Sequence, residues 1–205
     1  MSLIVKKFSI PPIDNNCYII INNNKAAIVD APTNIDEVLK YIKDHNLEAL
    51  YILLTHGHFD HIGGLDRLKN ATNANIVISE GCRYMLDSAT GSLGFSDAGF
   101  IQPKSQADII VNDGELLDFD DVKIKVHIIS GHTKGDAVYE IENKLFTGDT
   151  LFAGSIGRTD LPGGDFDLLS KNLKRLISLP NDYNVFPGHG DSTTIEKEKK
   201  TNPYL

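Results

Sequence analysis

The stretch at 55–64, which reads Thr-His-Gly-His-Phe-Asp-His-Ile-Gly-Gly, constrains this chain more than any other part of it. Within six positions it carries three histidines and one carboxylate, namely His56, His58, Asp60 and His61. The apolar run at 50–54 is typical of a buried strand, and the residues from 65 onward begin like a helix. Open sheets place their sites on loops at the carboxyl ends of strands. Because imidazole and carboxylate are ligands of zinc, iron and manganese, this loop is predicted to bind metal.

Three further candidate ligands occur later, each on a turn after an extended segment and each directly after a glycine. They are His132, Asp149 and His189. Glycine permits sharp turns and close backbone approach, which suits a side chain aimed into a crowded site. Two other histidines lie outside these loops. His45 ends a predicted helix and is expected at the surface, whereas His127 lies inside a predicted strand and is expected to be structural.

Two metal ions would account for all seven of these candidate ligands. The predicted ligands are His56, His58 and His132 for the first ion, Asp60, His61 and His189 for the second, and Asp149 for both. Two metals about 3.5–4 Å apart with a bridging water form a hydrolytic centre, because they lower the pKa of that water toward about 7. Asp60 is also expected to be catalytic, as the acceptor of the nucleophile's proton. The ions are expected to be zinc, with iron or manganese as alternatives.

The remaining pattern predicts an α/β protein with one domain over 1–205. Extended segments at 3–10, 17–21 and 26–29 precede a helix that Thr33 or Asn34 would cap and that runs to Asn46. Further helices are expected at about 63–70, 80–87 and 165–177, the last capped by Asp165. Strands are expected at 75–79, 109–111, 122–129, 137–141, 144–147 and 184–186. Strand-rich stretches alternate with helices in both halves, which suits a four-layer αββα sandwich with the metal site on strand-end loops between the sheets.

Composition excludes some function classes. The chain has 28 acidic and 20 basic side chains, a formal charge of −8, and no visible basic face, so a nucleic-acid partner is not expected. No apolar run reaches about 18 residues, so no membrane span is expected. The first residues lack a signal-peptide layout, and Cys17 and Cys82 are expected to be reduced, buried thiols. A cytoplasmic protein with a small-molecule substrate is predicted, and the oligomeric state stays open.

The pattern Thr-His-x-His-x-Asp-His at 55–61, followed by Gly-His, Gly-Asp and Gly-His, resembles the metallo-β-lactamase superfamily. The resemblance implies an αββα fold and a metal centre between the sheets. The stretch at 157–165 resembles the glyoxalase II-like branch and the persulfide dioxygenases. The end, at 187–204, resembles short single-domain glyoxalase II-like hydrolases of bacteria. The function so implied is thioester hydrolysis of the S-2-hydroxyacylglutathione type by a metal-bridging hydroxide.

Some positions depart from the glyoxalase II pattern. Gly57 stands where glyoxalase II has a third histidine, Asp30-Ala31-Pro32 replaces Asp-Pro-Gly, and the chain ends 16 residues after His189, without a helical region that helps to hold glutathione. Two alternatives therefore stay open. One is a mononuclear iron persulfide dioxygenase with His56, His132 and Asp149 as ligands. The other is a lactonase of the same superfamily.

Two further features have alternative interpretations. Arg158 is predicted either to contact an anionic group of the substrate or to form an ion pair that shapes its own loop. The irregular segment at 88–106 is interpreted either as a functional lid or as a passive surface excursion.

Overall fold

The computed structural model describes residues 3–11, 13–97 and 99–205, and its strands form two large sheets. The first sheet has the order β1-β2-β3-β4-β5-β6. Its strands are β1 (Ile4–Ile10), β2 (Asn15–Asn22), β3 (Lys25–Val29), β4 (Glu48–Leu53), β5 (Asn75–Ser79) and β6 (Ile109–Val111). The first three are antiparallel, and β3 to β6 are parallel. Parallel pairing needs crossovers, and these carry α1 (Asp36–Asp44), α2 (Phe59–Ile62), α3 (Leu65–Thr72) and the 3-10 turns η1 (Arg83–Leu86) and η2 (Gly94–Ser96).

The second sheet has the order β14-β13-β10-β9-β8-β7. Its strands are β7 (Leu116–Phe119), β8 (Val122–Ile128), β9 (Ala137–Ile141), β10 (Lys144–Gly148), β13 (Asn184–Pro187) and β14 (Thr193–Thr194). All pairs are antiparallel except β10 with β13. A small hairpin of β11 (Leu151–Phe152) and β12 (Ser155–Ile156) follows β10, and the helices are α4 (Phe166–Ile177) and α5 (Ile195–Thr201).

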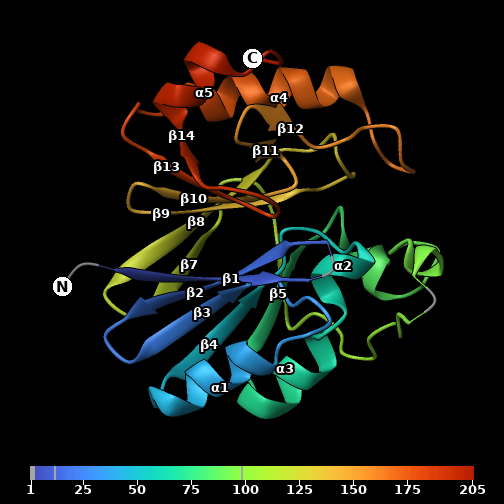
Figure 1. The fold of residues 1–205 in the computed structure, drawn as a ribbon, viewed down its shortest axis with the longest axis vertical. Coiled ribbons are helices and arrows are strands. Elements are labelled where there is room, and N and C mark those ends of the chain that lie inside the picture. The colour runs from blue at the N-terminus through green and yellow to red at the C-terminus, as the bar shows by residue number, and fades with distance from the viewer. Residues whose placement is uncertain (1–2, 12, 98) are drawn as a thin grey trace.

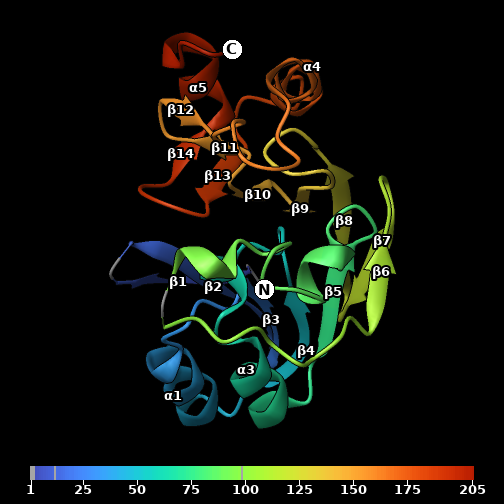
Figure 2. The same ribbon diagram turned by 90° about the vertical axis from the view of Figure 1, so that its right-hand side faces the viewer.

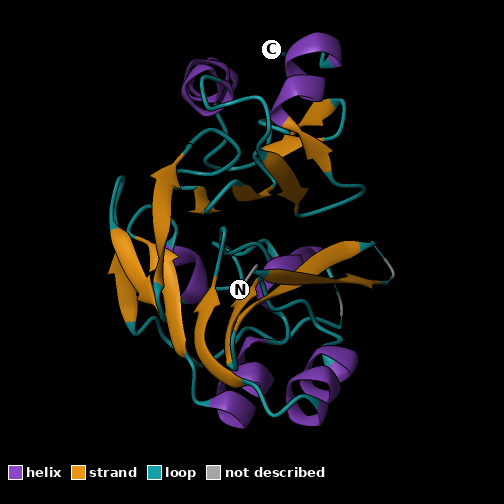
Figure 3. Ribbon diagram, turned by 90° about the vertical axis from the view of Figure 1, so that its left-hand side faces the viewer, coloured by secondary structure: helices purple, strands orange, loops and turns teal. Residues whose placement is uncertain are grey.

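The two sheets lie face to face, with α1 and α3 on one outer side and α4 and α5 on the other (Figures 1 and 2). In the view coloured by secondary structure, these four helices lie outside the strands (Figure 3). Three buried apolar clusters correspond to the three interfaces between the layers. The first cluster joins α1 and α3 to the first sheet, and the second fills the space between the sheets. The third joins α4 and α5 to the second sheet. The predicted four-layer αββα fold is confirmed.

The predicted helix boundaries needed three corrections. α1 begins after Ile35, which is buried and gives no side-chain cap, so neither Thr33 nor Asn34 caps it, and it ends at Asp44 rather than at Asn46. The helix expected at 63–70 is α3, shifted by two residues, and the single turn α2, which was not predicted, precedes it and carries two of the predicted ligands, Asp60 and His61. The helix expected at 80–87 is reduced to the 3-10 turn η1. The cap of α4 is confirmed, because Asp165 accepts a hydrogen bond from the Leu168 amide at 2.9 Å.

Several other expectations can be compared with the described residues. His45 is exposed at the end of α1, and His127 lies in β8 and bonds to Glu140. Cys17 and Cys82 are both buried and free, as predicted. Burial raises the pKa of the Cys82 thiol to about 12, so it stays protonated at neutral pH. Among the helices that the structure describes, none is long and apolar enough to span a bilayer. Ala98, within the 88–106 segment, lies outside the described residues.

The C-terminal helix α5 depends on a buried carboxylate. Thr194 caps the helix, and Glu198, which is fully buried, accepts hydrogen bonds from the Thr193 hydroxyl (2.6 Å), the Gly154 amide (2.8 Å) and the Asn202 amide group (2.9 Å). These bonds join α5 to β14 and to the turn between β11 and β12. That turn belongs to the segment that follows Asp149, so the helix braces a loop beside the candidate site.

We therefore expect Glu198→Ala to lower the free energy of unfolding by about 2–4 kcal/mol, because three buried donors lose a charged acceptor. Urea denaturation followed by circular dichroism measures the effect. The matched control is Glu196→Ala, which removes an exposed glutamate from the same helix and should change stability little. Equal effects of the two substitutions would show that the buried network does not stabilise this end of the chain.

Candidate metal centre

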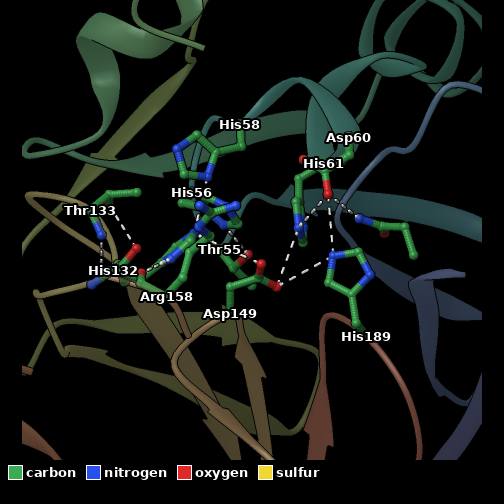
Figure 4. Close-up of polar contacts among 12 residues, drawn as sticks. Thr55, His56, His58, Asp60, His61, His132, Thr133, Asp149, Arg158 and His189 are labelled. Atoms are coloured by element: carbon green, nitrogen blue, oxygen red, sulfur yellow. Dashed lines mark hydrogen bonds and ion pairs between the residues drawn. The ribbon is translucent and has the colours of Figure 1, made fainter. Parts of the chain in front are cut away.

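The seven predicted ligands lie together where strands of both sheets end (Figure 4). The first sheet supplies four of them, because β4 leads into the loop that carries His56 and His58, and the single turn α2 carries Asp60 and His61. The second sheet supplies the rest on the loops after β8, β10 and β13, namely His132, Asp149 and His189. The centre therefore lies between the two sheets.

The first group consists of three imidazoles. The ligand-type atoms of His56, His58 and His132 lie within 4.8 Å of one another. Their rings meet edge to face, with centroids 4.6 Å apart for His56 and His58 and 4.8 Å apart for His58 and His132. All three residues are buried. Three nitrogen donors converging in a buried space match the ligand set of a tris-imidazole metal site.

The second group consists of two imidazoles and a carboxylate. Asp60 Oδ2 lies 3.2 Å from His189 Nε2 and 3.4 Å from His61 Nε2. The amide group of Asn15, on β2, donates a 3.4 Å hydrogen bond to the same oxygen. His61 is buried, whereas His189 and Asp60 are partly exposed. This group is therefore the more accessible of the two.

Asp149 lies between the two groups. Its Oδ1 is 3.4 Å from His61 Nε2 and 3.7 Å from His189 Nε2, which both belong to the second group. Its Oδ2 is 3.8 Å from His132 Nε2, which belongs to the first group. One carboxylate oxygen thus faces each group. This arrangement is the one expected of a residue that would contact two ions.

Whether the residues present fit metal ions can be judged from their unpaired atoms. Among the described residues, three atoms that face the centre are buried without a hydrogen-bond partner, namely the Nε2 atoms of His56 and His61 and Oδ1 of Asp149. His58 turns its Nδ1 toward His132 Nε2, at 3.0 Å (Figure 4). Each buried, unpaired polar atom costs about 1–3 kcal/mol, so native proteins rarely leave one without a partner. Cations placed among these ligands would satisfy the three unpaired atoms. The donor set of imidazole nitrogen and carboxylate oxygen suits zinc, iron or manganese.

Asp30 was missed by the sequence analysis as part of the site. It is buried at the end of β3, and its Oδ2 accepts a 2.8 Å hydrogen bond from His61 Nδ1. Its Oδ1 accepts a 2.8 Å bond from the Thr55 amide. A carboxylate on one ring nitrogen fixes the tautomer and leaves the other nitrogen to ligate metal. The signal in the sequence was a carboxylate directly after a buried strand, the same signal that identified the histidine loop.

The other histidines are oriented by backbone groups. His132 Nδ1 bonds to the carbonyl oxygen of Arg158 at 2.8 Å, and His189 Nδ1 bonds to that of Ile13 at 3.1 Å. Asp136 was also missed, and its Oδ2 accepts from the backbone amides of His132 (3.1 Å) and Thr133 (2.8 Å). In both histidines Nδ1 is engaged, so Nε2 faces the centre.

The glycine before each later ligand has a steric reason. A Cβ atom at Gly188 would lie 2.3 Å from Asp149 Oδ1 and 2.9 Å from His61 Cε1, inside the centre itself. Gly131 has a φ of +141°, and a Cβ there would lie 2.3 Å from Leu169 in α4. Gly188 thus lets the backbone of the second sheet approach His61 of the first, whereas Gly131 lets its loop pack against α4.

The pKa values of the histidines differ between the two groups. Burial, assisted by the neighbouring imidazoles, lowers the pKa of His56 well below its usual range and that of His58 to about 3. Burial also opposes protonation of His61, yet Asp60, Asp30 and Asp149 outweigh it and raise its pKa well above the usual value. The pKa of His189 is raised by Asp60 and Asp149 against the effect of burial. His61 and His189 therefore take up protons at a higher pH than His56 and His58.

The remaining candidates lie outside the centre. The guanidinium of Arg158 forms a two-bond ion pair with Asp160, at 2.7 and 2.8 Å, and both side chains are largely exposed. The ion-pair interpretation of Arg158 is thus confirmed for its side chain, and its contact with substrate stays a prediction. In the 88–106 segment, the Ser92 carbonyl accepts from the Phe59 amide at 2.9 Å, which places the segment beside α2.

Comparison with known proteins decides the family. A family model described as the metallo-beta-lactamase superfamily matches residues 10–189, which include all seven predicted ligands. The chain belongs to the metallo-beta-lactamase superfamily. The fold and the order of the motifs along the chain agree with this membership, so the resemblance inferred from the sequence is confirmed at the level of the superfamily.

Three similar proteins illustrate the range of this superfamily. One is a hydroxyacylglutathione hydrolase, GloC, of Haemophilus influenzae, 34% identical over 198 residues that cover 93% of this chain and 92% of that protein. A crystal structure described as the BLEG-1 B3 metallo-beta-lactamase has a TM-score of 0.93 and 33% identity, and covers 98% of this chain and 99% of that one. The structure of TTHA1623 in a di-iron-bound form has a TM-score of 0.85 and 31% identity, with coverage of 98% and 100%.

The position of Asp149 between the groups leads to a prediction about metal content. Asp149→Asn keeps the shape but removes the negative charge between two cations, whose repulsion at short range is worth several kcal/mol even at an effective dielectric of about 20. We expect this variant to lose one ion outright and to bind the other weakly. Asp60→Asn should be milder, because Asp60 belongs to one group only. Zinc and iron titration of both variants measures the difference, and two tightly bound ions in Asp149→Asn would contradict a bridging role.

The pKa pattern leads to a prediction about pH. A protonated imidazole cannot bind metal, so ions compete with protons at His61 and His189 but not at His56 and His58. As pH falls through the raised pKa values of His61 and His189, their proton occupancy rises, and we expect zinc stoichiometry to fall from two to one before the remaining ion is lost. Calorimetric titration in buffers of different ionisation enthalpy counts the released protons. This order would be contradicted if binding of the first ion released as many protons as binding of the second.

Proposed function

We propose that this protein binds two divalent metal ions through the seven predicted ligands and hydrolyses thioesters, with S-2-hydroxyacylglutathione as the type of substrate. The observation that carries the proposal is the position of Asp149, whose two oxygens face two separate three-residue groups. The ions are proposed to be zinc, with iron or manganese as alternatives. Similarity to the hydroxyacylglutathione hydrolase GloC supports the choice of substrate.

The reaction adds water across a carbon–sulfur bond. A new carbon–oxygen bond forms at the carbonyl, the bond to sulfur breaks, and the products are a carboxylic acid and a thiol. Bound metal ions would supply a water molecule of lowered pKa and would polarise the carbonyl. No Ser, Cys or Thr nucleophile is required by this scheme, which agrees with the burial of both cysteine thiols.

Asp60 is proposed to take the proton of the attacking water. Its carboxylate is fixed by His61, His189 and Asn15 around one oxygen. Burial alone would raise the pKa of Asp60, but the charges of His61 and His189 outweigh it and hold the pKa below its usual range. The carboxylate is therefore ionised at neutral pH and holds the proton only briefly before passing it to the departing sulfur.

The test combines metal analysis with activity assays. Purified protein should contain up to two transition-metal ions per chain and should release glutathione from S-D-lactoylglutathione at neutral pH. The same preparation is assayed with glutathione persulfide and oxygen, with a homoserine lactone and with a chromogenic cephalosporin. Oxygen uptake by a one-iron protein would establish the dioxygenase alternative, and turnover of the lactone or the cephalosporin alone would replace the thioester proposal.

Two buried histidines, one a predicted metal ligand and the other not, provide a test of the ligand assignment. His132 is buried in the first group, and His127 is buried in β8 of the same sheet with Glu140 as its partner. We expect His132→Ala to lower thioester kcat/KM by several orders of magnitude, since a ligand is lost. His127→Ala should stay within a few-fold of the parent protein. Comparable losses in both variants would overturn the ligand assignment.

A further inference from the structure

A pocket of about 300 Å³ opens beside the second ligand group. Apolar surface comes from Ile10 at the end of β1, Ile13 in the connection to β2, Pro32 in the loop after β3, and Phe59 in α2. Asp60 and Asp97 also line it, and Asp97 comes from the 88–106 segment. This volume lies at the lower end of the range for ligand sites, which suits one small group rather than a whole substrate.

The pocket is continuous with the candidate centre. Asp60 belongs both to the pocket lining and to the second ligand group. Ile13, on the opposite wall, accepts a hydrogen bond from His189 Nδ1 through its carbonyl oxygen. A thioester carbonyl held among the ligands would therefore place one of its two neighbouring groups in this pocket.

The charges of the lining indicate which of the two groups fits. Within the part of the chain that the structure describes, the lining contains two carboxylates and no lysine, arginine or histidine. The glutathione part carries two carboxylates and one ammonium group, so placing it in the pocket would bring a net negative charge against Asp97, which is not among the proposed metal ligands. A neutral acyl group has no such cost and gains by covering Ile10, Ile13 and Phe59.

We infer that this pocket binds the acyl group of the substrate and selects neutral, apolar acyl chains over anionic ones. This inference rests on the proposed thioester hydrolysis and adds to it the class of acyl group. The thiol part then lies on the other side of the centre, outside the pocket. The segment at 94–97 takes part in recognition through Asp97, which gives the 88–106 segment a function in specificity.

The first test varies the acyl chain while the thiol stays constant. Acetyl, butyryl, hexanoyl and succinyl thioesters of glutathione are compared by kcat/KM. Each added methylene that enters the pocket should raise kcat/KM by about fourfold until the pocket is filled, from about 0.8 kcal/mol per buried methylene. The succinyl thioester should be at least about tenfold poorer than the butyryl thioester, because its carboxylate would face Asp97.

The second test changes the lining. In Asp97→Asn the side-chain oxygen can still accept the 2.8 Å bond from the Gly99 amide, so the turn is kept while the charge is removed. We expect the butyryl-to-succinyl ratio to fall about threefold or more. The matched control is Asp87→Asn, an exposed aspartate of the preceding turn that does not line the pocket, and it should leave the ratio unchanged. Ser96 also lines the pocket, so Ser96→Phe, which reduces the pocket volume, should lower the hexanoyl-to-acetyl ratio.

The outcomes separate the two proposals. If metal-loaded protein hydrolyses no thioester, whatever its acyl group, the proposed function itself is overturned, and the assignment of the pocket falls with it. If thioesters are hydrolysed but the rate is independent of acyl length and of succinyl charge, only the assignment of the pocket is overturned. Equal shifts in Asp97→Asn and Asp87→Asn would also overturn it, because a change in overall charge would then explain the effect.

Discussion

Three buried polar atoms that face the centre without a protein partner impose the main constraint on this molecule. The Nε2 atoms of His56 and His61 and Oδ1 of Asp149 are excluded from water and accept no hydrogen bond from the described chain. At about 1–3 kcal/mol each, their combined cost is comparable with the whole stability of a typical domain, which is about 5–15 kcal/mol. Two apolar clusters that cover the outer faces of the sheets and one between them offset this cost. Cations bound among these atoms would stabilise the folded state by mass action.

Both sheets are needed to assemble these atoms. The histidine loop and α2 follow strand β4 of the first sheet, whereas His132, Asp149 and His189 come from the second. Direct ties hold the sheets together next to the centre, because the Tyr18 hydroxyl on β2 donates to the Pro187 carbonyl at 2.7 Å, and the Asn16 side chain donates to the same oxygen at 2.9 Å. Pro187 precedes Gly188 and His189, so these bonds set the position of a ligand from across the sandwich.

Residue type and spacing made the ligands predictable, while their supports depend on the folded geometry. A histidine or aspartate after a glycine at a strand end is visible in the sequence, but nothing in residue type shows that Asp30 would reach His61 or that Asp136 would hold the loop of His132. Helix α5 was missed because, apart from buried Ile195, it shows no apolar period and its stabilising residue is a buried glutamate. The cap of α1 was predicted wrongly because burial of Ile35, a tertiary effect, decides where that helix begins.

The charges around the centre are arranged unequally on its two sides. On the side of the second group, the described residues of the pocket lining include Asp60 and Asp97 and no lysine, arginine or histidine. On the side of the first group, Arg158 lies close by, since its carbonyl oxygen bonds to His132, while its guanidinium is paired with Asp160 in water. Exposed ion pairs contribute little to stability, so opening this pair to meet an anionic group costs little. In the proposed reaction the acyl chain would meet the pocket lining, and a contact of the thiol part with Arg158 stays a prediction.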